Sequence, residues 1–71
     1  MEELTFTIEG PYIELIGLLK ATGIAQTGGH AKMIVEDGEV LRNGEPEDRK
    51  RAKLVPGDII EIADQLRITL Q

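Results

Sequence analysis

The spacing of apolar residues changes abruptly at Gly38, and this change constrains the fold more than any other feature. Before it, Leu15 and Leu19 belong to an apolar stripe that recurs every three or four positions, which is typical of an amphipathic helix. After it, Ile60 and Ile62 alternate with polar neighbours, the period of a half-buried strand. The chain is therefore expected to be an α+β domain with helices on one face of a sheet.

Two helices are expected in the first half of the chain, after an opening strand over residues 4–8. The first helix is predicted over about 11–22, because proline suits a first helical turn. Gly23 is placed to end this helix in a left-handed conformation. Thr27 is a typical N-cap for a second, shorter helix that stops at Gly38.

Four short strands are expected after the helices, which gives the order β-α-α-β-β-β-β. The pair Asn43-Gly44 predicts a hairpin, since both central positions of that turn need positive φ. Pro46 has no N–H and predicts an edge strand. The predicted strands cover 40–42, 45–46, 60–62 and 66–70. The predicted core contains Phe6, Ile8, Leu15, Ile16, Leu19, Ala31, Ile34, Val35, Val40, Ile60, Ile62 and Ile68.

The residue inventory excludes several kinds of chemistry. The 71 residues include no cysteine and no serine, and His30 is the single histidine. Ser/His and Cys/His nucleophilic systems, disulfides and thiolate zinc sites all need residues that the chain lacks. A superficial calcium-loop pattern fails because Leu41 stands at a ligand position and Arg42 where glycine is needed. We expect neither an enzyme nor a metal or cofactor site.

Positive charge is concentrated in one short stretch of an acidic chain. The net charge is −5, yet residues 42–53 carry a net +2 and hold five of the eight basic residues. In an extended segment, Arg49, Arg51 and Lys53 would point to one side, where they could contact phosphates. The acids of this stretch, Glu45, Glu47 and Asp48, are candidate salt-bridge partners that would lower its effective charge.

The joint spacing of several short motifs carries a family resemblance. Leu15, Leu19 and Gly23 are followed by Thr27-Gly28-Gly29-His30-Ala31, Gly38-Glu39-Val40-Leu41-Arg42-Asn43-Gly44 and Gly57-Asp58-Ile59-Ile60. Over about residues 11–62 this pattern resembles the alpha-L RNA-binding motif, the S-four-like domain, in its small stand-alone bacterial form. Two positions depart from it. Gly28 replaces an arginine, and Arg42 replaces a valine and either ends the core face early or adds a cation near the groove.

The resemblance implies one non-catalytic domain over residues 1–71 that recognises structured RNA, either ribosomal or transfer RNA. It also implies a link to the ribosome or its precursors. Backbone N–H groups at the start of the second helix would bind phosphate beside the basic run. The scarcity of aromatic residues favours recognition by shape, and Tyr12 is expected to pack against the helix. The candidate RNA-binding residues are Thr27, Gly28, Gly29, His30, Lys32, Arg42, Arg49, Lys50, Arg51 and Lys53.

Two other functions compete with RNA binding. A protein-interaction module could keep the fold without binding RNA, which net acidity and Gly28 favour and the clustered cations oppose. Ubiquitin-like sulfur carriers also have Asn-Gly hairpins, but they need a Gly-Gly terminus where this chain ends in Leu70-Gln71. No apolar run approaches the roughly 18 residues of a membrane span, and the acidic N-terminus is unlike a signal peptide. We expect a cytoplasmic monomer without membrane contact.

Overall fold

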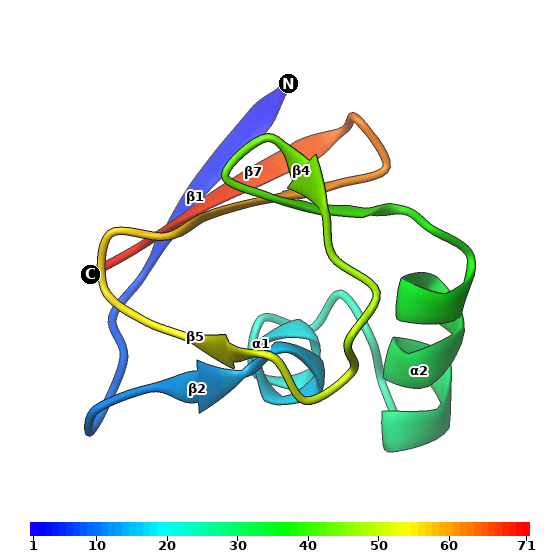
Figure 1. The fold of residues 1–71 in the computed structure, drawn as a ribbon, viewed down its shortest axis with the longest axis horizontal. Helices are drawn as coiled ribbons and strands as arrows, with labels where there is room; N and C mark the ends of the chain where they lie inside the picture. The colour runs from blue at the N-terminus through cyan, green and yellow to red at the C-terminus, as the bar shows by residue number, and fades with distance from the viewer.

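The computed structural model describes residues 1–71 and places two helices against one face of a five-stranded sheet (Figure 1). The elements are β1 (Glu2–Phe6), β2 (Ile13–Glu14), α1 (Leu15–Ala21), α2 (Gly28–Glu36), β3 (Val40–Arg42), β4 (Glu45–Pro46), β5 (Lys53–Leu54), β6 (Ile59–Ile62) and β7 (Leu66–Leu70). This arrangement confirms the predicted α+β fold and the order of the predicted elements, to which the structure adds the two-residue strands β2 and β5. Neither helix is long and apolar enough to cross a membrane.

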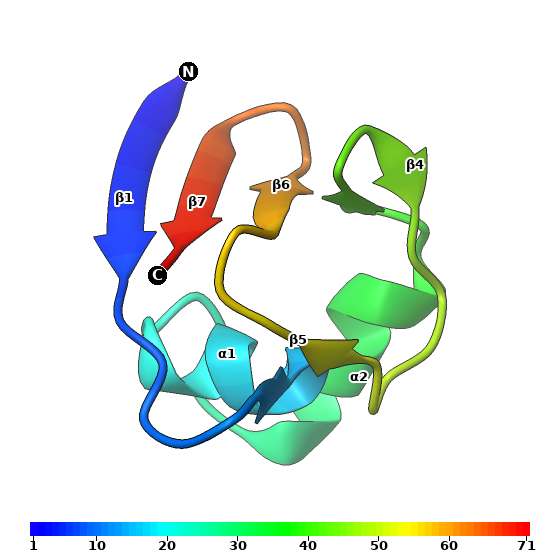
Figure 2. The same ribbon diagram turned by 60° about the vertical axis from the view of Figure 1, so that its left-hand side comes forward.

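The main sheet has the strand order β1-β7-β6-β3-β4 and is antiparallel except at one edge. There β1 runs parallel to β7, with Leu4 aligned to Ile68. The first and last strands of the chain therefore lie side by side, while the proline-containing β4 forms the opposite edge (Figure 2). The position of β4 agrees with the missing N–H of Pro46.

The core lies between the sheet and the helices and contains 15 buried apolar residues. Ten of the twelve predicted core residues are among them, whereas Phe6 and Ile16 are only partly buried. The predicted core left out five residues that are also buried: Leu18, Ala25, Ala52, Leu54 and Leu70. Ala52 and Leu54 matter most for the site, because they alternate with basic residues and fix that segment to the core.

The first helix begins at Leu15. The sequence had predicted a start near residue 11, which is wrong. The preceding two residues form β2, which pairs with β5 in a separate two-stranded sheet. The N–H groups of Leu15 and Ile16 donate to the carbonyl oxygens of Ala52 (3.0 Å) and Lys50 (3.1 Å). The free donors at a helix start need acceptors, and here a distant part of the chain supplies them.

The second helix and the hairpin follow their local signals closely. The Oγ1 atom of Thr27 accepts a hydrogen bond from the N–H of His30 at 3.0 Å, as an N-cap does. Gly38 follows the helix with φ of +74°, and Asn43 and Gly44 have φ of 53° and 86° in the hairpin turn. These conformations explain the residue types at these positions.

Candidate functional site

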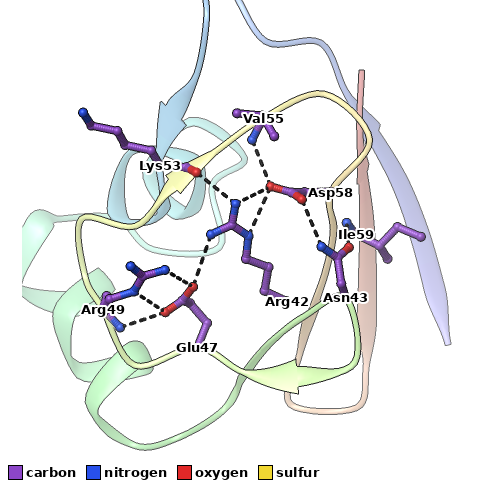
Figure 3. Close-up of polar contacts among 8 residues, drawn as sticks. All are labelled: Arg42, Asn43, Glu47, Arg49, Lys53, Val55, Asp58 and Ile59. Carbon is purple, nitrogen blue, oxygen red and sulfur yellow. Dashed lines mark hydrogen bonds and ion pairs between the residues drawn. The ribbon is translucent and has the colours of Figure 1, made fainter.

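Arg42 holds the basic segment, residues 49–53, against the rest of the fold (Figure 3). Its Nε and Nη2 atoms donate to Asp58 Oδ2 at 3.2 and 2.8 Å. Nη1 donates to Glu47 at 3.4 Å, and Nη2 also donates to the carbonyl oxygen of Lys53 at 3.0 Å. All three guanidinium nitrogens are thus engaged, so Arg42 ties β3 to β5 and to the turn that precedes β6.

Asp58 is the acceptor on which this arrangement depends. Its side chain is only 10% exposed, and it also accepts from the N–H of Val55 at 2.9 Å and from Asn43 Nδ2 at 3.0 Å. Asn43 in turn accepts from the N–H of Ile59 at 2.8 Å. We call Arg42, Asn43, Glu47 and Asp58 the Arg42 cluster. The Gly-Asp and Asn-Gly motifs of the sequence therefore meet in one structural unit.

Both carboxylates of the cluster are stabilised in their ionised form. The pKa of Glu47 lies below its usual value, chiefly because the Arg49 side chain donates hydrogen bonds to it. Burial acts to raise the pKa of Asp58, but the Val55 N–H, the Asn43 amide and the Arg42 guanidinium outweigh that effect and lower it. The cluster thus keeps two negative charges near Arg42 and the neighbouring Arg49.

These lowered pKa values predict a loss of stability in acid. The folded chain binds fewer protons at Glu47 and Asp58 than the unfolded chain, so their contribution is complete above the unfolded pKa values. It should be lost as the pH falls from about 4.5, the ordinary value for glutamate, through the lowered folded values. Urea denaturation between pH 7 and 3 measures this, and Glu47→Gln should reduce the pH dependence. A wild-type stability that stays constant over this range would contradict the prediction.

The cations of the basic segment divide into paired and free groups. Arg49 is 69% exposed and donates to both carboxylate oxygens of Glu47, at 3.1 and 3.2 Å. The Lys50 ammonium group lies 2.6 Å from Glu36 at the end of α2. Arg51 has no carboxylate within 4.0 Å, and neither does Lys53. The expectation that local acids lower the charge of this segment holds for Glu47. The positive charges of Arg51 and Lys53 are not neutralised by a carboxylate.

An open hollow of about 410 Å³, which we call the cationic hollow, brings most of these cations together. It is lined by Arg42, Arg49, Arg51, Ala52 and Lys53, and no acidic residue forms part of its wall. Figure 3 shows the Lys53 side chain extending away from the Arg42 cluster while its carbonyl oxygen faces Arg42. Because Ala52 is buried, its two basic neighbours in the chain are directed towards solvent.

The start of α2 forms a second group of candidate residues. The N–H groups of Gly28 and Gly29 have no acceptor within the chain, while His30 Nδ1 accepts from the N–H of Gln26 at 3.4 Å. Lys32 is exposed on the next turn. None of these residues lines the cationic hollow, and no hydrogen bond or ion pair joins the two groups. No cluster of three or more acidic or histidine side chains with metal-binding geometry is present.

A small α+β scaffold that presents a hollow lined by cations defines a binding domain. The model of the S4 domain family matches residues 6–70, and the chain belongs to this family. This result confirms the family resemblance that the motifs carry, and it places the chain among non-enzymatic modules.

Two relatives extend the comparison. The chain is 38% identical over 60 residues to an Escherichia coli (strain K12) protein named "Putative RNA-binding protein YbcJ", over 83% of this chain and 86% of that protein. It is 41% identical over 56 residues to a Bacillus subtilis (strain 168) protein named "Probable ribosome maturation protein RlbA", over 79% of each chain. Both similarities span most of the two proteins compared.

Proposed function

We propose that the chain binds structured RNA, ribosomal or transfer RNA, through the cationic hollow. The observation that carries this proposal is that Arg51 and Lys53 have no carboxylate partner and lie on a segment fixed by buried neighbours. The names of the two relatives, which refer to RNA binding and to ribosome maturation, support it. Ribosomal RNA or a ribosomal precursor is the partner that agrees with both names.

The fixed geometry of the basic segment supports recognition by shape. Leu54 is fully buried, and the carbonyl oxygens of Lys50 and Ala52 accept hydrogen bonds from the start of α1. The side chains of Arg51 and Lys53 therefore project from a backbone that is already ordered before RNA binds. Phosphates spaced along a folded RNA would meet cations at fixed positions, which selects for shape more than for base sequence.

The paired cations have a different role in this proposal. Arg49 shares its charge with Glu47, Arg42 is engaged by Asp58, and Lys50 is paired with Glu36. We propose that they add little net charge and hold the segment in place, and that Arg51 and Lys53 make the closest phosphate contacts. The exposed start of α2, with Thr27, Gly28, Gly29, His30 and Lys32, is proposed as a second contact for the same RNA.

Salt dependence tests the role of the two free cations. Wild-type affinity for ribosomal or transfer RNA should fall with salt at a slope of log K against log salt of about −3. The double variant Arg51→Gln, Lys53→Gln should flatten that slope by about 1.5, because two phosphate contacts are lost. Filter-binding titrations at four salt concentrations measure both slopes.

A matched double variant controls for the loss of charge. Lys20→Gln with Arg67→Gln removes two positive charges from residues that do not line the hollow. This variant should keep the wild-type slope within experimental error. If the Arg51 and Lys53 variant also keeps its affinity and slope, the segment serves only solubility, and the protein-interaction module becomes the better hypothesis.

A further inference from the structure

Tyr12 lies outside the helix in which the sequence had placed it. It precedes β2, and 40% of the residue is exposed. The chain has one tyrosine, one phenylalanine and no tryptophan. An exposed aromatic ring in so aromatic-poor a chain provides a stacking surface that the core does not use.

Tyr12 forms part of a second hollow with a different character from the first. This hollow measures about 330 Å³ and is lined by Phe6, Thr7, Glu9, Tyr12 and Ile13. Three of the five lining residues are apolar, and the only charged one is an acid. A phosphate would be repelled by Glu9, whereas a neutral planar group with N–H donors would suit both the ring and the carboxylate.

Lys53 connects the two hollows. It lines the cationic hollow, and its Nζ atom lies 5.0 Å from the centroid of the Tyr12 ring, a cation–π distance. The pairing of β2 with β5 fixes this neighbourhood, since Ile13 is aligned with Leu54 and Glu14 with Lys53. A nucleotide with its phosphate at Lys53 would therefore have its base beside Tyr12.

We propose that the Tyr12 hollow binds one unpaired nucleobase of the RNA whose backbone occupies the cationic hollow. The base stacks on Tyr12, and Glu9 accepts hydrogen bonds from its Watson–Crick edge. Guanine fits this site best, because its N1–H and N2–H groups lie side by side and match a carboxylate. The proposal rests on the proposed RNA binding and adds a preference for a structured RNA that contains a bulged or looped-out guanine.

The chain provides its own reporter for this contact. Tyr12 is the single tyrosine and there is no tryptophan, so tyrosine emission comes from this ring alone. Three RNA hairpins with the same stem serve as probes, one fully paired, one with a bulged guanosine and one with a bulged uridine. The tyrosine fluorescence lifetime should shorten with the guanosine bulge and stay near the free value with the paired stem.

Variants separate stacking from charge. Tyr12→Leu should weaken binding of the guanosine-bulge hairpin by about tenfold, the typical loss for one stacked base. Binding of the paired hairpin and the salt slope should not change, since no charge is removed. Tyr12→Phe should bind the guanosine-bulge hairpin with the wild-type affinity that Tyr12→Leu loses. Glu9→Gln should reduce the preference for guanosine over uridine.

Each negative result has a distinct meaning. If no hairpin binds in the filter assay, the proposed RNA binding itself fails. If the hairpins bind with the expected salt slope but the lifetime is the same for all three, RNA binding stands and the base site is overturned. Equal losses for paired and bulged hairpins with Tyr12→Leu would also overturn it, because Tyr12 would then act only through the position of Lys53.

Discussion

Replacement of Asp58 by alanine is expected to lower the free energy of unfolding by about 3 kcal/mol, a large share of the stability of a domain of this size. The carboxylate accepts from Arg42, Asn43 and the N–H of Val55. Its removal leaves the partly buried Arg42 guanidinium without its main acceptor, and an unpaired charge of this kind is costly. The Asn43 side-chain amide and the Val55 N–H lose the same acceptor. Urea denaturation at pH 7 measures the change.

Two controls identify the cause of this loss. Asp48→Ala removes an exposed acid of the same region and should change the free energy of unfolding by less than about 0.5 kcal/mol. Arg42→Met combined with Asp58→Ala should cost clearly less than the sum of the single variants, because the second change removes the charge that the first left unpaired. Additive losses, or a cost below about 1 kcal/mol for Asp58→Ala, would show that the Arg42 cluster does not hold this face together.

The features that the sequence predicted well are those whose causes are local. Thr27 caps the helix that it precedes, and Asn43-Gly44 forms the turn in which it stands. The start of α1 was misplaced because its determinants are distant. Leu15 and Ile16 donate to carbonyl groups about 35 residues further along the chain. Periodicity describes which face of a segment is apolar and cannot include such a partner.

The candidate site shows the same division between local and distant causes. The three cations expected to share a surface do so, since Arg49, Arg51 and Lys53 line one hollow, but residues 50–51 form a turn and not the extended segment from which this was predicted. Charge counting could not tell which cations are neutralised. Lys50 is paired with Glu36, fourteen positions away, and Arg42 with Asp58, sixteen positions away. The sequence left open whether Arg42 ends the core face early or adds a cation near the groove, because the answer depends on this tertiary contact.

The Tyr12 hollow was missed for a related reason. Tyr12 falls in phase with Leu15 and Leu19, so a helical pattern assigned it to a buried face. Helix α1 in fact contains only seven residues, and the pairing of β2 with β5 moves the ring out to the surface. A shortened helix therefore converts an apparent core residue into a surface one.

Replacement of Leu19 by alanine is expected to give a loss of the same order as that of Asp58, about 2–5 kcal/mol. Leu19 is fully buried within α1 and belongs to the core cluster that lies between the helices and the sheet. The truncation removes apolar contacts and leaves a cavity, and a core of only 15 buried apolar residues has few neighbours that can move to fill it. In a domain this small, each 1 kcal/mol corresponds to about 4–8 °C in Tm.

Met33→Ala provides the matched control, because Met33 lies on α2 and is 60% exposed. That change should alter the free energy of unfolding by less than about 0.5 kcal/mol. Thermal and urea denaturation of both variants give the comparison. A cost below about 1 kcal/mol for Leu19→Ala would mean that this face of α1 is loosely packed. The basic segment, whose Lys50 and Ala52 carbonyl oxygens accept from the start of α1, would then lose the rigid support on which phosphate recognition by shape depends.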